Sequence, residues 1–262
     1  MIIQDQINRE LSITNNPQRI VSLVPSITYT LSDFGLNKEV KGITRFDKFL
    51  PYSKKEKIII GGTKDVKIDR IKDINPDIIL ANKEENTKEI VETLEKIAPV
   101  FVSDIKNYTD NSDFIKKIGT IFQKQELAHK YIQDIENLRN QLQQPNQEPV
   151  RAIYLIWKKP WMTVGGDTFI NEVMKIGGFE NLYQNQKRYP ETSIKEMQEL
   201  HPEIILLSSE PYPFKEKEQK ELQSLFPNTQ IKLVEGEAFT WFGTYPLKGF
   251  EYLLKLKQKS NA

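Results

Sequence analysis

The residues best suited to chemistry in this chain are aromatic and cationic side chains that follow short apolar runs. Trp157 follows one such run, and Arg45 and Phe46 follow another. A further pair, Arg188 and Tyr189, lies in an irregular stretch that is rich in aromatic residues. Aromatic rings bury a large area at low conformational cost, and Arg suits carboxylate, phosphate or catecholate oxygens. These residues indicate a binding site for a bulky ligand.

The chain has few of the Cys and His side chains that bind metals or act as nucleophiles. The chain has no Cys, which excludes disulfides, Cys-ligated zinc or iron–sulfur sites and a thiol nucleophile. A metal site would need several His and carboxylates around one ion, but there are 2 His. His129 lies in a predicted helix, and His201 precedes a proline at the start of a predicted strand. We therefore expect no metal site and no Ser–His–Asp triad.

Two glycine pairs and one acidic pair could also suggest enzyme chemistry. Residues 61–63 and 164–167 lack the spacing of phosphate-binding loops, so we interpret them as tight turns. Glu84 and Glu85 precede a predicted helix, where acids favour the helix dipole, and this use is a simpler explanation than paired catalytic carboxylates. We predict no catalytic residues, no enzyme activity and no cofactor.

The length, charge and apolar content of the chain limit the classes of partner that it could bind. The chain has 262 residues, enough for two lobes, and its formal net charge of +1 gives no reason to expect nucleic acid. No apolar run approaches the roughly 20 residues of a membrane span. The opening stretch, MIIQDQINRELSI, carries charges too often for the apolar core of a signal peptide. Either a leader has been removed or the protein is made without one.

The predicted elements that position these residues are alternating strands and helices, which favour parallel α/β sheets. Residues 124–144 contain no Gly or Pro and carry apolar side chains three or four positions apart, so they predict one long helix of about 30 Å. Residues 71–80 and 197–206 share a pattern of helix end, proline, acid and apolar strand. Two further matches occur in the same order, which indicates a duplicated unit.

The fold class predicted from these patterns is α/β, with two similar parallel-sheet lobes bridged by a single long α-helix. The predicted domains are an N-terminal lobe at 1–123, a bridging helix and connector at 124–146, and a C-terminal lobe at 147–262. Ligands of open α/β sheets bind outside the carboxyl ends of the strands, so we expect the cleft between the lobes to hold the ligand.

The candidate ligand-binding residues follow from these strand ends. In the first lobe they are Pro25, Ser26, Arg45, Phe46, Gly62, Thr63 and Lys83. In the second lobe they are Trp157, Trp161, Arg188, Tyr189, Ser209, Tyr212 and Trp241. The tryptophans could instead cover the core, and Lys83 could be solvated.

Several stretches resemble one family, the ABC-importer substrate-binding proteins that carry cobalamin, haem and ferric siderophores. The likeness lies in residues 19–26, 61–62, 71–80, 177–182, 188–190 and 197–206. It implies a monomeric, extracytoplasmic (periplasmic) protein that delivers a bulky metal chelate to the membrane subunits of an ABC importer. Residues 188–190 look similar to an aromatic-Pro segment of the cobalamin-binding members, in which case Tyr189 would stack on a corrinoid.

The resemblance also implies docking on the transporter through one surface acid in each lobe. Glu191 or Glu196 lies in the matching segment of the second lobe, and Glu56 is the nearest acid in the first.

Two alternatives stay open from the sequence. A two-lobed enzyme that uses a nucleotide or a sugar-nucleotide would need an acid/base or phosphate site at the strand ends. A cytosolic sensor or carrier could use the same fold without a transporter, and its gene would lack an upstream leader.

Overall fold

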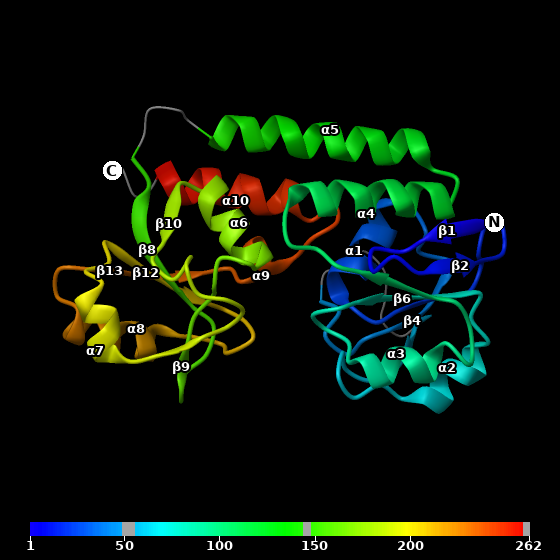
Figure 1. Cartoon of the computed structure of the whole chain (residues 1–262), viewed down its shortest axis with the longest axis horizontal. Coiled ribbons are helices and arrows are strands. Elements are labelled where there is room, and N and C mark those ends of the chain that lie inside the picture. Colours follow the sequence, from blue (N-terminus) through cyan, green and yellow to red (C-terminus); the bar gives the residue numbers. More distant parts are fainter. Residues whose placement is uncertain (49–55, 144–147, 259–262) are drawn as a thin grey trace. The chain divides into compact units, whose positions relative to one another are not determined.

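The computed structural model describes residues 1–48, 56–143 and 148–258, and the chain divides into two compact units (Figure 1). The first unit contains Met1–Asp134 and Phe242–Tyr245, and the second contains Ile135–Trp241 and Pro246–Ala262. Each unit has its own parallel sheet, so the predicted α/β class with two parallel-sheet lobes is confirmed. The domain boundaries predicted at 123 and 147 stay predictions.

The sheet of the first unit has five parallel strands in the order β5-β4-β3-β6-β7. Its strands are β3 (Ile20–Ser22), β4 (Val40–Ile43), β5 (Ile58–Ile59), β6 (Ile78–Asn82) and β7 (Val100–Ser103). Figure 1 shows α2 and α3 below this sheet and α1 and α4 above it. Because helices cover both faces, β3, β6 and β7 are buried along their whole length and their sequences are almost continuously apolar. The helices are α1 (Pro25–Asp33), α2 (Ile68–Ile74), α3 (Lys88–Leu94) and α4 (Tyr108–Ile121).

The sheet of the second unit has four parallel strands in the order β10-β8-β12-β13. These are β8 (Val150–Leu155), β10 (Phe179–Asn181), β12 (Ile204–Ser208) and β13 (Gln230–Val234). A small antiparallel ribbon pairs β9 (Trp161–Met162) with β11 (Glu191–Thr192). The helices are α6 (Phe169–Ile176), α7 (Ile194–Glu199), α8 (Glu216–Leu225), α9 (Glu237–Thr240) and α10 (Pro246–Gln258). The core packs Ile153, Leu155, Ile205 and Leu207 of β8 and β12 against Leu222 of α8.

The predicted long helix is α5 (Gln125–Leu142), and the division between the units falls inside it. In the first unit, the hydroxyl of Tyr131 donates to the carbonyl of Asp33 at 3.0 Å, and its ring stacks on Phe34. A side chain on Gly119 of α4 would lie 2.6 Å from the Cβ of Ala128, so glycine permits α4 and α5 to approach closely. The end of the predicted connector, from 144 to 146, lies outside the described residues.

Several helix limits differ from those predicted. The sequence pattern predicts a helix at 27–33 with Ser26 as its cap, but α1 begins at Pro25, because the fixed φ of proline suits the first helical position. The sequence pattern also predicts a helix at 112–122, but α4 begins four residues earlier, since the side chain of Asn107 accepts a hydrogen bond from the backbone of Asp110. Residues 235–244 read as a loop from their sequence, but they contain the short helix α9.

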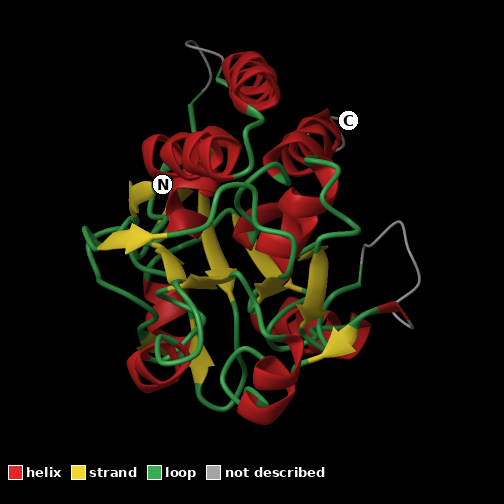
Figure 2. Ribbon diagram, turned by 90° about the vertical axis from the view of Figure 1, so that its right-hand side faces the viewer, coloured by secondary structure: helices red, strands yellow, loops and turns green. Residues whose placement is uncertain are grey.

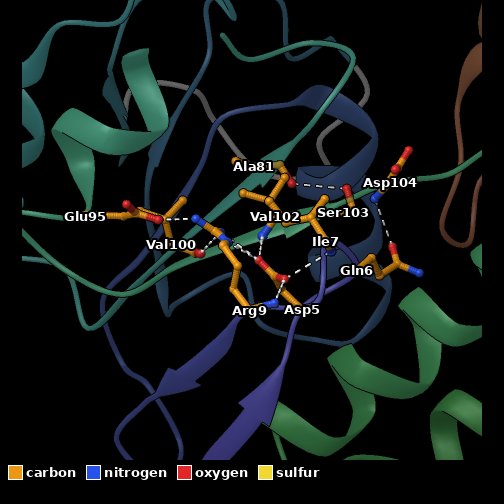
Figure 3. A network of polar contacts seen from close by, with 10 residues as sticks. All are labelled: Asp5, Gln6, Ile7, Arg9, Ala81, Glu95, Val100, Val102, Ser103 and Asp104. Carbon is orange, nitrogen blue, oxygen red and sulfur yellow. Dashed lines mark hydrogen bonds and ion pairs between the residues drawn. The ribbon is translucent and has the colours of Figure 1, made fainter. Parts of the chain in front are cut away.

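An N-terminal arm, which we define as residues 1–13, lies along the outer edge of β7 (Figure 3). It forms an antiparallel hairpin of β1 (Ile2–Gln4) and β2 (Glu10–Ser12). The N-terminus at which this arm begins is marked in Figure 2. The backbone N–H of Gln6 donates to Val102 at 3.1 Å, and the backbone N–H of Asp104 donates to the side chain of Gln6 at 3.3 Å. The arm therefore pairs with groups that an edge strand would otherwise expose.

A buried carboxylate organises this arm (Figure 3). Asp5 accepts from the backbone N–H groups of Ile7 at 3.0 Å, Arg9 at 2.9 Å and Val102 at 3.3 Å. The guanidinium of Arg9 donates to Asp5 at 2.7 Å and to the carbonyl of Val100 at 2.8 Å. Arg9 also pairs with Glu95. One acid thus joins the arm to the sheet edge.

Candidate functional site

The predicted residues of the first unit follow strands of one parallel sheet. Arg45 and Phe46 follow β4, Gly62 and Thr63 follow β5, Pro25 and Ser26 follow β3, and Lys83 follows β6. Because the strands are parallel, their carboxyl ends lie at the same edge of the sheet. The topology thus places all seven predicted residues along one edge.

The Arg45 guanidinium is the main cationic group at this edge. It donates two hydrogen bonds to Asp65, at 2.7 and 3.1 Å, and it lies 4.8 Å from the centre of the exposed Phe46 ring. The hydrogen bond from Arg45 is the largest cause that holds the pKa of the Asp65 carboxyl below its usual value. Asp65 was not predicted as a site residue, because it follows the glycine turn and its partner is 20 residues away.

The glycine turn lies against this ion pair. Gly61 has φ +107, and a side chain there would collide with the carbonyl of Asp65. A side chain on Gly62 would collide with the carboxylate of Asp65 and lie 3.0 Å from Arg45 Nη2. The two glycines therefore permit a close approach of backbone and side chains, as the tight-turn interpretation predicts.

Other predicted residues at this edge are less accessible or already paired. Ser26 is 2% exposed, so a ligand could reach it only after rearrangement, whereas Pro25 is half-buried. The ammonium of Lys83 donates to Asp104 at 2.7 Å. The carbonyl of Thr63 accepts from the side chain of Asn86 at 2.8 Å.

Glu85, at the same edge, has a raised pKa. The surrounding protein desolvates its carboxyl, and this outweighs the opposite effects of Lys64 and of a hydrogen bond from Thr63. The side chain nevertheless remains exposed to solvent.

In the second unit, an aromatic cluster formed by Trp157, Trp161, Tyr212 and Phe214 follows β8 and β12. Trp157 is 39% exposed and meets Tyr212 edge to face at 5.7 Å. Tyr212 contacts Phe214 at 4.7 Å, and Phe214 stacks on Trp161 with an interplanar angle of 2°. Trp161 also packs against the core of its unit. The cluster thus has an exposed end at Trp157 and a supporting end at Trp161.

Arg188 and Tyr189 lie just before β11 of the antiparallel ribbon in this unit. The backbone N–H of Arg188 donates to the carboxylate of Asp167 at 2.6 Å, and its carbonyl accepts from Gly165 at 2.7 Å. Its guanidinium lies 5.4 Å from the centre of the Tyr189 ring. A side chain on Gly166 would collide with the carbonyl of Gln184, so the predicted turn at 164–167 permits close approach of the segment that leads to Arg188.

Two carboxylates near the ends of β12 and β13 were not predicted as site residues. Glu210 accepts from the hydroxyl of Thr240 at 2.9 Å and from the indole N–H of Trp241 at 3.2 Å. Glu237 accepts from the hydroxyl of Ser209 at 3.2 Å. Trp241 and Ser209, both predicted to contact ligand, are therefore held by acids. The only sequence signal was the position of Glu210 directly after a strand, and Glu237 had none.

A buried tyrosine of β8 interacts electrostatically with both carboxylates. The Tyr154 hydroxyl donates to Ser208 at 2.9 Å, and burial strongly raises the pKa of this tyrosine. Both side chains are fully buried. We interpret the pair as support for the end of β12.

The three acids predicted for docking lie in different surroundings. Glu191 is exposed at the start of β11, and Glu56 is exposed just after the residues that are not described. Glu196 is half-buried, and its carboxylate accepts from the hydroxyl of Thr192 at 3.1 Å. Of the two acids predicted for docking in the second unit, Glu191 is therefore more accessible than Glu196.

Residues 1–48, 56–143 and 148–258 contain neither a cluster of metal ligands nor a membrane-spanning helix. In this part of the chain, no three His, Cys, Asp or Glu side chains are arranged to hold a metal ion. No helix there has the length and hydrophobicity needed to cross a membrane.

The chain matches a family model described as periplasmic binding protein over residues 20–229. The match runs from β3 to the residue before β13 and so includes most of both units.

Two curated proteins illustrate the sequence similarity. The vitamin B12-binding protein of Vibrio campbellii is 24% identical over 204 residues, which cover 76% of this chain and 74% of that protein. The uncharacterized ABC transporter substrate-binding lipoprotein YvrC of Bacillus subtilis is 23% identical over 215 residues, which cover 78% of this chain and 68% of that protein.

A solved structure illustrates the similarity in fold. A periplasmic haem-binding protein from Pseudomonas aeruginosa matches with a TM-score of 0.79 and 16% identity, covering 90% of this chain and 91% of that one. At this identity the likeness shows the fold alone.

Proposed function

Because this chain belongs to the periplasmic binding protein family, we propose that it is the substrate-binding protein of an ABC importer for a bulky metal chelate. The family resemblance stated from the sequence is confirmed. Vitamin B12 and haem, which the similar proteins are named for, are both large macrocyclic chelates. We therefore propose a cobalamin-type corrinoid first, and haem or a ferric siderophore as the alternative ligands.

The observation that best supports a chelate is the exposed indole of Trp157. It lies at the carboxyl end of β8, where ligands of parallel sheets bind, and Tyr212 holds it edge to face. A rigid aromatic face supplies contact area without much ordering cost. The ring therefore suits the apolar face of a macrocycle.

Arg45 of the first unit and Arg188 of the second are each proposed to bind an anionic oxygen of a ligand. Each guanidinium lies over an aromatic ring, Phe46 or Tyr189 respectively, which restricts its orientation. A restricted guanidinium loses less freedom when it binds an oxygen anion. The proposed principal contact of the first unit is Arg45, and those of the second unit are Arg188, Tyr189 and Trp157.

Calorimetric titration tests this proposal. The protein would be titrated separately with cyanocobalamin, haemin and a ferric hydroxamate siderophore. Saturable 1:1 binding of at least one chelate is expected, and Arg188→Ala should weaken it while leaving the thermal midpoint unchanged. Lys187→Ala, which alters the neighbouring exposed cation, is the matched control. Absence of binding by all three chelates would refute the chelate proposal.

We also propose that the protein acts outside the cytoplasm and binds its chelate as a monomer without changing it chemically. The family match and the lipoprotein relative support this location. The expected results are recovery of chelate with an unaltered absorbance spectrum and a monomer mass by light scattering. A chemically altered chelate would instead favour the enzyme alternative.

Docking on the membrane subunits is proposed through Glu191 and Glu56, with Glu196 as the alternative in the second unit. Reversing the charge in Glu191→Lys should lower chelate uptake in cells without changing the affinity of the purified protein for chelate. Glu199→Lys is the control, because Glu199 is an exposed acid on the nearby helix α7. Equal uptake by both variants would exclude Glu191 as a docking residue.

A further inference from the structure

The ion pair between Arg45 and Asp65 has the geometry that a guanidinium uses to bind a ligand carboxylate. Both terminal nitrogens of Arg45 contact Asp65, Nη1 to Oδ2 at 2.7 Å and Nη2 to Oδ1 at 3.1 Å. Two parallel hydrogen bonds of this kind match the fork of a guanidinium to two oxygens. The pair lies just beyond β4 and β5, at the edge where ligand is expected.

The surroundings hold the guanidinium in this orientation. The Phe46 ring centre is 4.8 Å from the Arg45 guanidinium carbon. A side chain on Gly62 would collide with the Asp65 carboxylate and lie 3.0 Å from both Arg45 Nη2 and Phe46 Cε2. The side chains of Arg45, Phe46 and Asp65 therefore lie close together around Gly62, which has no side chain of its own. These contacts orient the Arg45 guanidinium so that two of its nitrogens face the oxygens of an anion.

The carboxylate of Asp65 accepts from the backbone N–H of Gly62 as well as from Arg45, but the ion pair is exposed to solvent. The side chain of Arg45 is 50% exposed and that of Asp65 is 54% exposed. Ion pairs this exposed contribute little, because water and salt screen them. Asp65 also lies in the turn between β5 and α2, outside any helix or strand. Another oxygen anion could therefore replace it without breaking regular structure.

We propose that Asp65 occupies the ligand's place on Arg45 in the unliganded protein, and that an anionic oxygen group of the chelate displaces it. This inference rests on the proposed function, and it adds a property of the ligand, namely a carboxylate or phosphate at its periphery. Asp65 then acts as an internal competitor that lowers the affinity for chelates that carry such a group.

Removing the charge of the competitor tests the inference. In Asp65→Asn, haemin, which carries two carboxylates, should bind about two- to fivefold more tightly at low salt, the range expected for an exposed pair. The gain should shrink as salt is raised. Asp69→Asn is the matched control, because it removes the same charge from an exposed acid on α2 and should bind as the wild type does.

Cyanocobalamin provides the second arm of the titration. Its anionic group is a phosphodiester, so a gain in Asp65→Asn larger than that for haemin would identify phosphate as the displacing group. A larger gain for haemin would identify carboxylate. Unchanged or weaker binding of both chelates in Asp65→Asn would overturn the inference while leaving the proposed function intact.

A measurement without chelate separates the two proposals further. The side-chain Nε–H resonance of Arg45, assigned by its loss in Arg45→Lys, would be followed by NMR during titration with citrate or inorganic phosphate. Half-maximal shift is expected at a lower anion concentration in Asp65→Asn than in the wild type. That result, combined with no chelate binding, would support the proposal that Asp65 competes for Arg45 and would refute the proposal that the ligand is a chelate. Equal midpoints in the two proteins would reject the competitor.

Discussion

The ring of Trp157 meets the ring of Tyr212 edge to face, with centroids 5.7 Å apart. The backbone N–H of Tyr212 donates to the carbonyl of Ile156 at 3.3 Å, so the loop after β12 is bound next to the residue that it supports. Behind Tyr212, Phe214 stacks on the half-buried Trp161. These two tryptophans, close in sequence, therefore have different positions: Trp157 offers an exposed ring and Trp161 supports the cluster.

Replacing Trp157 by Ala should weaken chelate binding on the order of tenfold, because the ligand loses an aromatic contact area. The thermal midpoint should change little, since the ring is 39% exposed. Calorimetry and thermal unfolding would measure the two effects. Leu225→Ala, which removes another exposed apolar side chain of the second unit at the end of α8, is the control and should bind as the wild type does. Wild-type affinity in Trp157→Ala would remove Trp157 from the proposed site.

Gly243 should be intolerant of substitution. It lies in the Phe242–Tyr245 segment of the first unit, has φ +76, and a side chain there would collide with the Thr30 hydroxyl. Gly243→Ala should lower the free energy of unfolding by about 3 kcal/mol or more, from backbone strain and overlap together. Chemical denaturation would measure it.

Gly35→Ala is the matched control for this prediction. Gly35 has a similar φ of +71, but a Cβ added there would have no atom within 4 Å. It should lose only the roughly 1–2 kcal/mol of backbone strain. Equal losses in the two variants would show that the overlap with Thr30 is relieved at negligible cost.

Asp5→Ala should detach the N-terminal arm from β7. The substitution removes the acceptor of Arg9 and of three backbone N–H groups, and the Asp5 side chain is 0% exposed. We expect a loss of about 2–4 kcal/mol in the free energy of unfolding, because the partners are left without their acceptor. Faster amide hydrogen exchange at Val102 would locate the change. Asp69→Ala, at an exposed acid, should change stability by less than about 0.5 kcal/mol.

Stability should fall in alkali partly through Tyr131. Burial, followed by the nearby Asp33, raises the pKa of Tyr131 from 10.0 to about 12. The folded protein holds this proton more tightly, so its contribution is complete below pH 10 and is lost as the pH rises towards 12. Tyr131→Phe should therefore show a shallower decline of the urea midpoint over this range. A decline as steep as that of the wild type would contradict the assignment.

Much of the fold could be predicted from local patterns. Apolar runs such as those of β6 and β12 indicate buried strands, and their alternation with helices indicates parallel sheets, because parallel strands need crossover connections. The order of strands and helices also places Arg45 and Trp157 directly after strands. The position of a strand or helix, and of the residues that follow it, depends on residues close in the chain, and the hydrophobic periodicity of the sequence reflects these.

Only the tertiary structure decided which of those residues are already paired. Asp65 lies 20 residues from Arg45, and Glu210 lies 31 residues from Trp241, so no local period links them. The inclusion of Phe242–Tyr245 in the first unit depends on contacts such as that of Gly243 with Asn111, 132 residues apart. The sequence thus determined which side chains follow the strands. Packing between distant segments decided which of them meet a partner, because such contacts depend on how the elements fold together in space.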